Sequence, residues 1–280
     1  DVDLAASLAI DTDGATDAAA GDIVFDTTGN LDGAVDLSLD TSANGTATNN
    51  GGAVTLGVIG ANTRLTSLTV DTRDAGGGTD GTSTLNGNIS VDGGGDVDFS
   101  NALDVNLAGG GTITIDTDDA TLAATTVAGN VTFGSGALDA SAGEILVVDT
   151  STETSGTDNL DAGDITLGTL GGGTALGALD LIAEADGTGS GGTITFNGAI
   201  VATNNINVDN DGAGTATVAT AVTFNQNITS NAGSIDIDTE GAFNQSANSI
   251  TASAANQDIF VDSAQGNITT NDLTANDLVT

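Results

Sequence analysis

Seven residue types are missing from this chain of 280 residues: cysteine, histidine, lysine, methionine, proline, tryptophan and tyrosine. Without Cys, His or Lys, most nucleophile–base pairs and all lysine Schiff-base chemistry are excluded, and so is a small fold held by disulfides. The absence of proline is compatible with long β ladders, in which every backbone N–H is needed. Because no proline-rich linker divides the chain, we expect one repetitive domain over 1–280. Because Cys, His and Lys are absent, we expect no enzymatic activity.

Positive charge is nearly absent as well. Arg64 and Arg73 are the only cations, and the formal net charge is −37. Nucleic acid is therefore not an expected partner, since phosphate binding requires Lys and Arg, and an anionic membrane surface would repel the chain. There is also no run of about 20 apolar residues that could span a bilayer, so we expect no membrane insertion.

Neither an initiator methionine nor a signal peptide is visible, which indicates a mature or internal piece of a longer chain or fibre. Val, Ile, Leu and Phe are so few, for so high a net charge, that a disordered acidic chain is one alternative. These apolar residues are regularly patterned, however, and that pattern favours a folded chain with a narrow core.

The sequence repeats two short apolar blocks in alternation, with a period of about 28 residues. One block is aliphatic–x–aliphatic–Asp, often followed by Thr, and its copies are 21 to 33 residues apart. Its copies begin at Leu8, Leu37, Leu68, Ile89, Ile113, Leu146, Leu179, Ile206, Ile235 and Ile259. The other block reads VTF, ITL or similar, as at 131–133, 165–167 and 194–196.

Both blocks have the period-two pattern of half-buried strands, and Gly, Asn, Asp, Ser and Thr clusters between them are typical of turns. The sequence therefore predicts an all-β fold, a right-handed parallel β-solenoid (β-helix) of about ten coils and about 50 Å in length. The alternative is a set of tandem antiparallel β-sandwich domains. Such domains usually have a broad core with Trp or Tyr, whereas the aromatic residues here are seven Phe.

Segments such as "GDITLGTLGGGTALGALDL" at 163–181 and "GGTITFNGAI" at 191–200 resemble repeats of large bacterial surface adhesins. These are the filamentous-haemagglutinin-like and autotransporter-passenger proteins. The resemblance covers nearly the whole chain and consists of Gly-rich turns that alternate with VTF-type strands. It implies a right-handed parallel β-helix, secretion, and a role at a cell surface or in a fibre.

If coils stack in register, the Asp that ends the first block forms a column along the rod. Neighbouring carboxylates about 5 Å apart repel by roughly 1 kcal/mol in water, and bound calcium would relieve that repulsion. The column would comprise Asp11, Asp40, Asp71, Asp92, Asp116, Asp149, Asp209, Asp238 and Asp262. The candidate calcium ligands are Asp11, Asp13, Asp40, Asp71, Asp74, Asp116, Asp118, Asp149, Asp209, Asp211 and Asp238.

Two other interpretations of these carboxylates need no calcium. They are either a solvated acidic face or an adaptation to brine, in which many Asp and few Lys keep a protein soluble. Local pairing of the two arginines with Asp71 or Asp74 is also expected.

These observations together predict a structural protein of an extracellular filament, sheath, surface layer or adhesin stalk. Unpaired strand edges at its ends would add further copies head to tail. The alternative is a calcium-dependent adhesin that binds carbohydrate or another cell-surface ligand through long loops on one flank, at 40–52, 71–82 and 150–163.

Overall fold

The structure is a computed structural model, and it describes residues 1–12, 19–25, 28–43, 49–74, 77–92, 94–117, 127–152, 160–185, 189–210, 220–245 and 248–275. Every regular element in these ranges is a β-strand. The strands form three parallel sheets of ten strands each, and successive strands enter sheets A, B and C in turn. Each circuit of the three sheets is one coil.

The strands of each sheet, in spatial order, are as follows. Sheet A contains β1 (Val2–Asp3), β4 (Asn30–Asp32), β7 (Val58–Ile59), β10 (Ile89–Ser90), β13 (Thr112–Asp116), β16 (Ile145–Asp149), β19 (Ala178–Ile182), β22 (Ile206–Asn210), β25 (Ile235–Thr239) and β28 (Ile259–Ser263). Sheet B contains β2 (Leu8–Asp11), β5 (Asp36–Asp40), β8 (Ser67–Asp71), β11 (Val97–Asn101), β14 (Val131–Phe133), β17 (Ile165–Leu167), β20 (Ile194–Phe196), β23 (Ala221–Phe224), β26 (Ala242–Gln245) and β29 (Ile268–Thr269). Sheet C contains β3 (Ile23–Val24), β6 (Val54–Leu56), β9 (Thr82–Leu85), β12 (Asp104–Leu107), β15 (Ala137–Ala140), β18 (Thr169–Leu170), β21 (Ile200–Ala202), β24 (Ile228–Ser230), β27 (Ser249–Ala252) and β30 (Asp272–Ala275).

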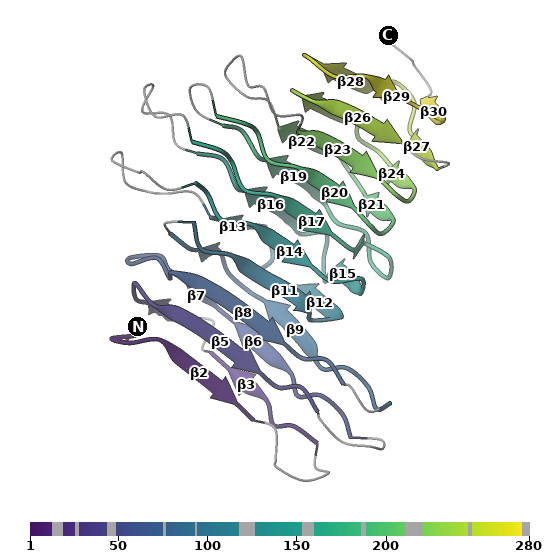
Figure 1. The fold of residues 1–280 in the computed structure, drawn as a ribbon. Coiled ribbons are helices and arrows are strands. Elements are labelled where there is room, and N and C mark those ends of the chain that lie inside the picture. The colour runs from purple at the N-terminus through teal and green to yellow at the C-terminus, as the bar shows by residue number, and fades with distance from the viewer. Residues whose placement is uncertain are drawn as a thin grey trace.

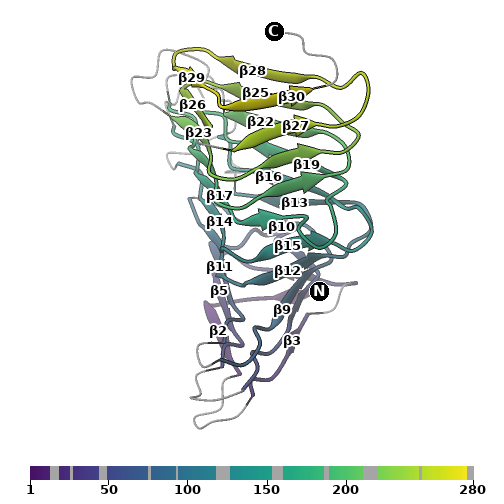
Figure 2. The ribbon, with the colours of Figure 1, turned by 90° about the vertical axis from the view of Figure 1, so that its right-hand side faces the viewer.

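The parallel β-solenoid expected from the sequence is confirmed. Each strand inside a sheet pairs in parallel with the strand three positions earlier and the strand three positions later, as β16 does with β13 and β19. Antiparallel sandwiches are therefore excluded. Figure 1 shows the coils stacked from the first strands at one end to the last strands at the other, and Figure 2 shows the sheets from the side. The right-handed sense of winding stays a prediction.

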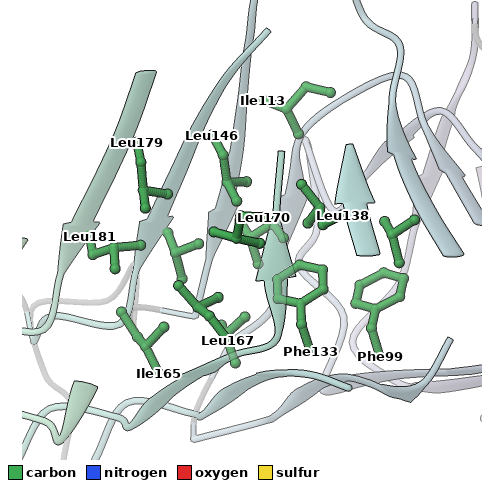
Figure 3. Close-up of a cluster of buried hydrophobic side chains, with 14 of the residues drawn as sticks. Phe99, Ile113, Phe133, Leu138, Leu146, Ile165, Leu167, Leu170, Leu179 and Leu181 are labelled. Carbon is green, nitrogen blue, oxygen red and sulfur yellow. The ribbon is translucent and has the colours of Figure 1, made fainter. Parts of the chain in front are cut away.

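The core is a set of apolar columns, because side chains alternate in and out along each strand and equivalent positions stack from coil to coil. In β19, Leu179 and Leu181 are buried, whereas Ala178, Asp180 and Ile182 are only half-buried. Buried Phe side chains stack in the same columns. The rings of Phe99 and Phe133 lie 5.3 Å apart and 7° from parallel, beside the aliphatic stacks of Figure 3.

The two sequence blocks change sheets along the rod, which the sequence analysis did not predict. The aliphatic–x–aliphatic–Asp block forms sheet B at β2, β5 and β8, but it forms sheet A from β13 onward. The long connection that follows it therefore moves too. In the first three coils it joins sheet B to sheet C, at 12–22, 41–53 and 72–81. From β13 to β22 it joins sheet A to sheet B.

Several of the long connections are closed at their base by a threonine and a glycine. The hydroxyl of Thr41 donates to the carbonyl oxygen of Gly52 (2.7 Å), and Thr117 and Thr150 bind Gly129 and Gly163 in the same way (2.6 and 2.7 Å). The glycines stack on one another, so that a methyl group on Gly163 would overlap the carbonyl oxygen of Gly129. These contacts give a structural role to the Thr that follows Asp in these copies of the repeat: it closes connections of different length.

Candidate functional site

The proposed column of nine aspartates is two columns on different sheets. On sheet B, Asp11, Asp40 and Asp71 are stacked partners, and Asn101 continues their column. On sheet A, Asp116 stacks on Asp149, and after Ile182 the column continues through Asp209, Asp238 and Asp262. The expectation of one continuous column was wrong because the repeat shifts by one sheet near residue 89.

Four of the candidate positions lie apart from both columns or cannot be placed. Asp74 forms an isolated bridge with Ala43, beyond the end of β8. Asp13, Asp118 and Asp211 fall outside the described residues. Asp92, a member of the expected column, also lies apart, because Ile89 pairs with Ile115 and strand β10 ends at Ser90.

The long loops that were expected on one flank lie at two different corners of the solenoid. Loops 41–53 and 72–81 join sheet B to sheet C, whereas 150–164 joins sheet A to sheet B.

Several of the stacked aspartates begin a turn through their own carboxylates. Asp40 accepts the backbone N–H of Ser42 (2.9 Å), Asp71 that of Arg73 (3.0 Å), and Asp149 that of Ser151 (3.0 Å). Each is an Asx turn, in which the side chain accepts the N–H two residues on. The Asp-Thr pair of the repeat thus has a structural explanation, since Asp starts the long connection and Thr closes it.

A second group of Asp and Asn side chains joins one coil to the next. Asp96 accepts the backbone N–H of Asn130 (2.8 Å), Asn130 that of Asp164 (2.8 Å), and Asp164 that of Thr193 (2.7 Å). Sequence reasoning missed this ladder, although its signal is an Asp or Asn just before three successive VTF-type strands, at 96, 130 and 164. Glu has a longer side chain than Asp, and Glu occurs at only four positions. The N–H groups that these side chains accept lie close to their own backbone, in the same turn or on the adjacent strand, so a short side chain suits them. This fits the predominance of Asp over Glu among the acidic residues.

Two aspartates have shifted pKa values, in opposite directions. The pKa of Asp71 is raised, chiefly by burial and then by the charge of Asp40 stacked beside it, against the lowering effect of the Arg73 N–H. Burial also raises the pKa of Asp32, but hydrogen bonds from Asn62 and Thr63 outweigh burial and hold that pKa below its ordinary value. The Asp32 side chain accepts both N–H groups of Asn62, backbone and amide, at 2.9 Å.

Arg64 joins three successive coils near the point where the repeat shifts. Its guanidinium donates to both carboxylate oxygens of Asp116, at 2.8 and 2.9 Å, and to the carbonyl oxygen of Val91 at 3.1 Å. A local pairing of Arg64 with Asp71 or Asp74 was expected from the sequence, whereas the ion pair that the structure gives it is with Asp116, 52 residues further along the chain.

Two features of the described residues bear on ligand binding. In the ranges described above, no group of three or more Asp or Glu side chains is placed to hold a metal ion. The outer face of sheet A has a shallow groove of about 380 Å³, lined by residues that include Ile145, Ala178, Asp180, Asn207 and Asp236. The side-chain amide of Asn207 donates a hydrogen bond to the Asp180 carboxylate (2.8 Å), so two of the polar side chains that line the groove bind each other.

The two ends of the solenoid expose residues that the interior coils bury. At the last coil, Ile268 is 47% exposed, whereas Phe243 directly below it in sheet B is fully buried. At the first coil, Val2 is 53% exposed and lies above a hollow of about 350 Å³ that Phe25 and Leu31 also line. Within the described residues, the strands of the first and last coils are therefore the outermost strands of their sheets.

Comparison with protein-family models, with curated proteins and with solved structures found no match to the chain. Within the residues that the structure describes, no helix is long and apolar enough to cross a membrane.

Proposed function

We propose that this chain is a structural, non-catalytic protein: a stiff rod of an extracellular filament, sheath, surface layer or adhesin stalk. The observation that supports this most is the set of three ten-stranded parallel ladders, which run through all the described coils. A rod of this kind resists bending because each coil is hydrogen-bonded to its neighbours in all three sheets.

Assembly with further copies of the chain, head to tail, belongs to the same proposal. Unpaired strand edges are templates for pairing with another chain, and a rod that grows at its ends forms an open filament. The acidic surface supports an extracellular setting of high ionic strength, where screening weakens the repulsion between the charges of neighbouring rods.

Calcium enters the proposal as an ion between rods or between stacked carboxylates. The columns Asp11–Asp40–Asp71 and Asp209–Asp238–Asp262 place carboxylates on neighbouring strands, about 4.8 Å apart. Calcium accepts such ligands in flexible geometry, and a cation shared by two acidic faces would bundle rods.

Electron microscopy of the purified chain tests the proposal. Samples are compared over a range of protein and salt concentrations, with calcium and with a chelator. We expect filaments one solenoid wide at high protein concentration, with calcium promoting their bundling. Dispersed single rods under every condition would remove self-assembly from the proposal, and turnover of a polysaccharide by the purified chain would overturn the non-catalytic assignment.

A further inference from the structure

The corner that joins sheet A to sheet B is formed by two facing columns of residues. The first column follows the aspartate column of sheet A by one residue, and its members are Thr117, Thr150, Ala183, Asn210, Thr239 and Ser263. The second column, called the glycine column below, lies two residues before the first apolar position of each sheet B strand, and its members are Gly129, Gly163, Gly192, Thr220, Gly241 and Gly266. A methyl group built on Gly192 would lie 3.1 Å from the Cβ atom of Ala183, so a side chain in the glycine column points at the facing residue of the first column.

The hydrogen bonds between the two columns change along the rod. At first a threonine donates to the glycine of its own coil, as Thr150 does to Gly163 (2.7 Å). Ala183 has no hydroxyl group, and the carbonyl oxygen of Gly192 accepts the side-chain amide of Asn210 from the next coil instead (3.0 Å). From this point the bonds run between coils and no longer within one coil.

This change leaves three buried oxygen atoms without a direct partner. Ser263 donates to the carbonyl oxygen of Gly241 (2.6 Å), which is the oxygen that faces Thr239 in its own coil. Thr220 is the one member of the glycine column with a side chain, and it faces Asn210. Within the described residues, Asn210 Oδ1, Thr220 Oγ1 and Thr239 Oγ1 have no hydrogen-bond partner, although the three residues are only 0%, 4% and 0% exposed, respectively.

We propose that this corner is a binding site for one buried water molecule, held by Asn210 Oδ1, Thr220 Oγ1 and Thr239 Oγ1. Asn210 and Thr239 are ladder partners, about 4.8 Å apart, and Thr220 faces Asn210 across the corner, so the three oxygen atoms border one space. A buried water molecule typically makes about three hydrogen bonds to polar groups that are otherwise unsatisfied. The inference is independent of the proposed function, because it concerns the interior of the rod alone.

The chemistry of the three groups favours water over a metal ion. Each threonine hydroxyl has a hydrogen that needs an acceptor, and the oxygen of one water molecule accepts both. The Asn210 oxygen carries no hydrogen, so it accepts a hydrogen from the same water molecule. A cation would leave both hydroxyl hydrogens without an acceptor, and calcium takes about six to eight oxygen ligands, whereas these side chains supply three.

The first test uses the sign of a change in melting temperature. Thr239→Val removes one of the three oxygen atoms and keeps the shape of the side chain. If water is bound, the variant loses a hydrogen bond, and its melting temperature, followed by circular dichroism, should fall by about 2–4 °C. In a corner without water the same change would remove an unpaired buried hydroxyl, which is neutral or stabilising. A Thr239→Val rod that melts at the same or a higher temperature than the unchanged protein would overturn the proposal.

Two control variants calibrate that sign. Ser83 is fully buried between its ladder partners Val54 and Val105, and its hydroxyl has no hydrogen-bond partner in the described part of the chain, so Ser83→Ala should leave the melting temperature unchanged or raise it. Thr150→Val loses a direct hydrogen bond and should lower it. Thr239→Val should behave like Thr150→Val, and behaviour like that of Ser83→Ala would contradict a bound water molecule.

The second test identifies the occupant. A high-resolution crystal structure of the chain should contain one density peak about 2.7–3.0 Å from each of the three oxygen atoms. A peak about 2.4 Å from its ligands, with a melting temperature that differs between sodium and tetramethylammonium chloride at equal ionic strength and does so less in Thr239→Val, would identify a cation and overturn the assignment to water. Direct hydrogen bonds among the three side chains, with no peak between them, would remove the site altogether.

Discussion

At the scale of single residues, most of the acidic side chains whose contacts are described have a structural partner. Asp40, Asp71 and Asp149 accept a backbone N–H of their own turn, and Asp96 and Asp164 accept one from the next coil. Carboxylates that accept N–H groups need no cation for this role, since a hydrogen bond to a charged acceptor is itself stabilising.

The two shifted carboxyl groups predict opposite responses to pH. Asp32 has a lowered pKa, so its stabilising contribution is complete above its ordinary value of 3.8 and is lost as the pH falls through its folded value. Asp71 has a raised pKa, so its charged form lowers the free energy of unfolding at neutral pH. That loss disappears on acidification below 3.8.

Urea unfolding of Asp32→Asn and Asp71→Asn at about pH 7 and about pH 3 measures both effects. Asp32→Asn should lower the free energy of unfolding by about 1 kcal/mol at neutral pH, with a smaller loss in acid. Asp71→Asn should raise it by a fraction of a kcal/mol at neutral pH, as surface charge pairs do, with no gain in acid. The same sign of change at neutral pH for both variants would contradict this account.

Arg64 supports a second prediction at this scale. Arg64→Ala removes a two-point ion pair with Asp116 that is largely shielded from solvent, and it should lower the free energy of unfolding by about 1–3 kcal/mol. Arg73→Ala is the matched control for charge and should change stability by less than about 0.5 kcal/mol. Arg64→Lys keeps the charge but not the fork of donors, so it should fall between the two. An Arg64→Ala rod as stable as the Arg73→Ala rod would show that the joint between coils does not depend on this pair.

At the scale of elements, the closure of each long connection separates the solenoid from the loop sequences attached to it. Thr150 and Gly163 hold the two ends of one connection together, and Gly163 stacks against Gly129 of the coil before. The number of residues between Thr and Gly differs among the connections that begin at Thr41, Thr117 and Thr150, but the closing contact is the same in all three.

Gly163→Ala tests the closure. Its methyl group would overlap the carbonyl oxygen of Gly129, so we expect a loss of roughly 1–3 kcal/mol, as overpacking typically causes. Gly111→Ala is the control, because nothing lies within 4 Å of a methyl group placed there. Thermal unfolding followed by circular dichroism compares the two variants, and similar melting temperatures would rule out close stacking of the glycines.

At the scale of the whole molecule, a net charge of −37 with two cations makes stability depend on salt. The free energy of unfolding should rise with sodium chloride, because screening relieves repulsion that is stronger in the compact rod than in the unfolded chain. Calcium at matched ionic strength distinguishes general screening from specific binding. A midpoint of urea unfolding higher in calcium than in sodium would support ligation by the stacked aspartates, and Asp238→Asn should then reduce that gain. Equal midpoints would remove calcium from the proposal.

The amount of apolar sequence also sets the shape of the molecule. A chain with so few large apolar residues cannot fill a broad core, but it can fill columns one or two side chains wide, and these columns bury the inward residues almost completely. A rod is the shape in which this composition satisfies both the apolar side chains and the charged surface.

The period-two pattern, the spacing of the repeat and the absence of proline determined the fold class, because each is a local property that strand pairing turns directly into stacked coils. They also determined that Asp would be stacked on Asp, as in Asp11, Asp40 and Asp71. Only the tertiary structure decided that Asp116 and Asp149 lie on a different sheet, that Arg64 reaches Asp116, and that Thr220 faces Asn210. A local pattern does not say which sheet a strand joins. Strand β10 could enter a different sheet without any change in its own alternation of inward and outward side chains. Its partner strands alone determine which sheet it joins.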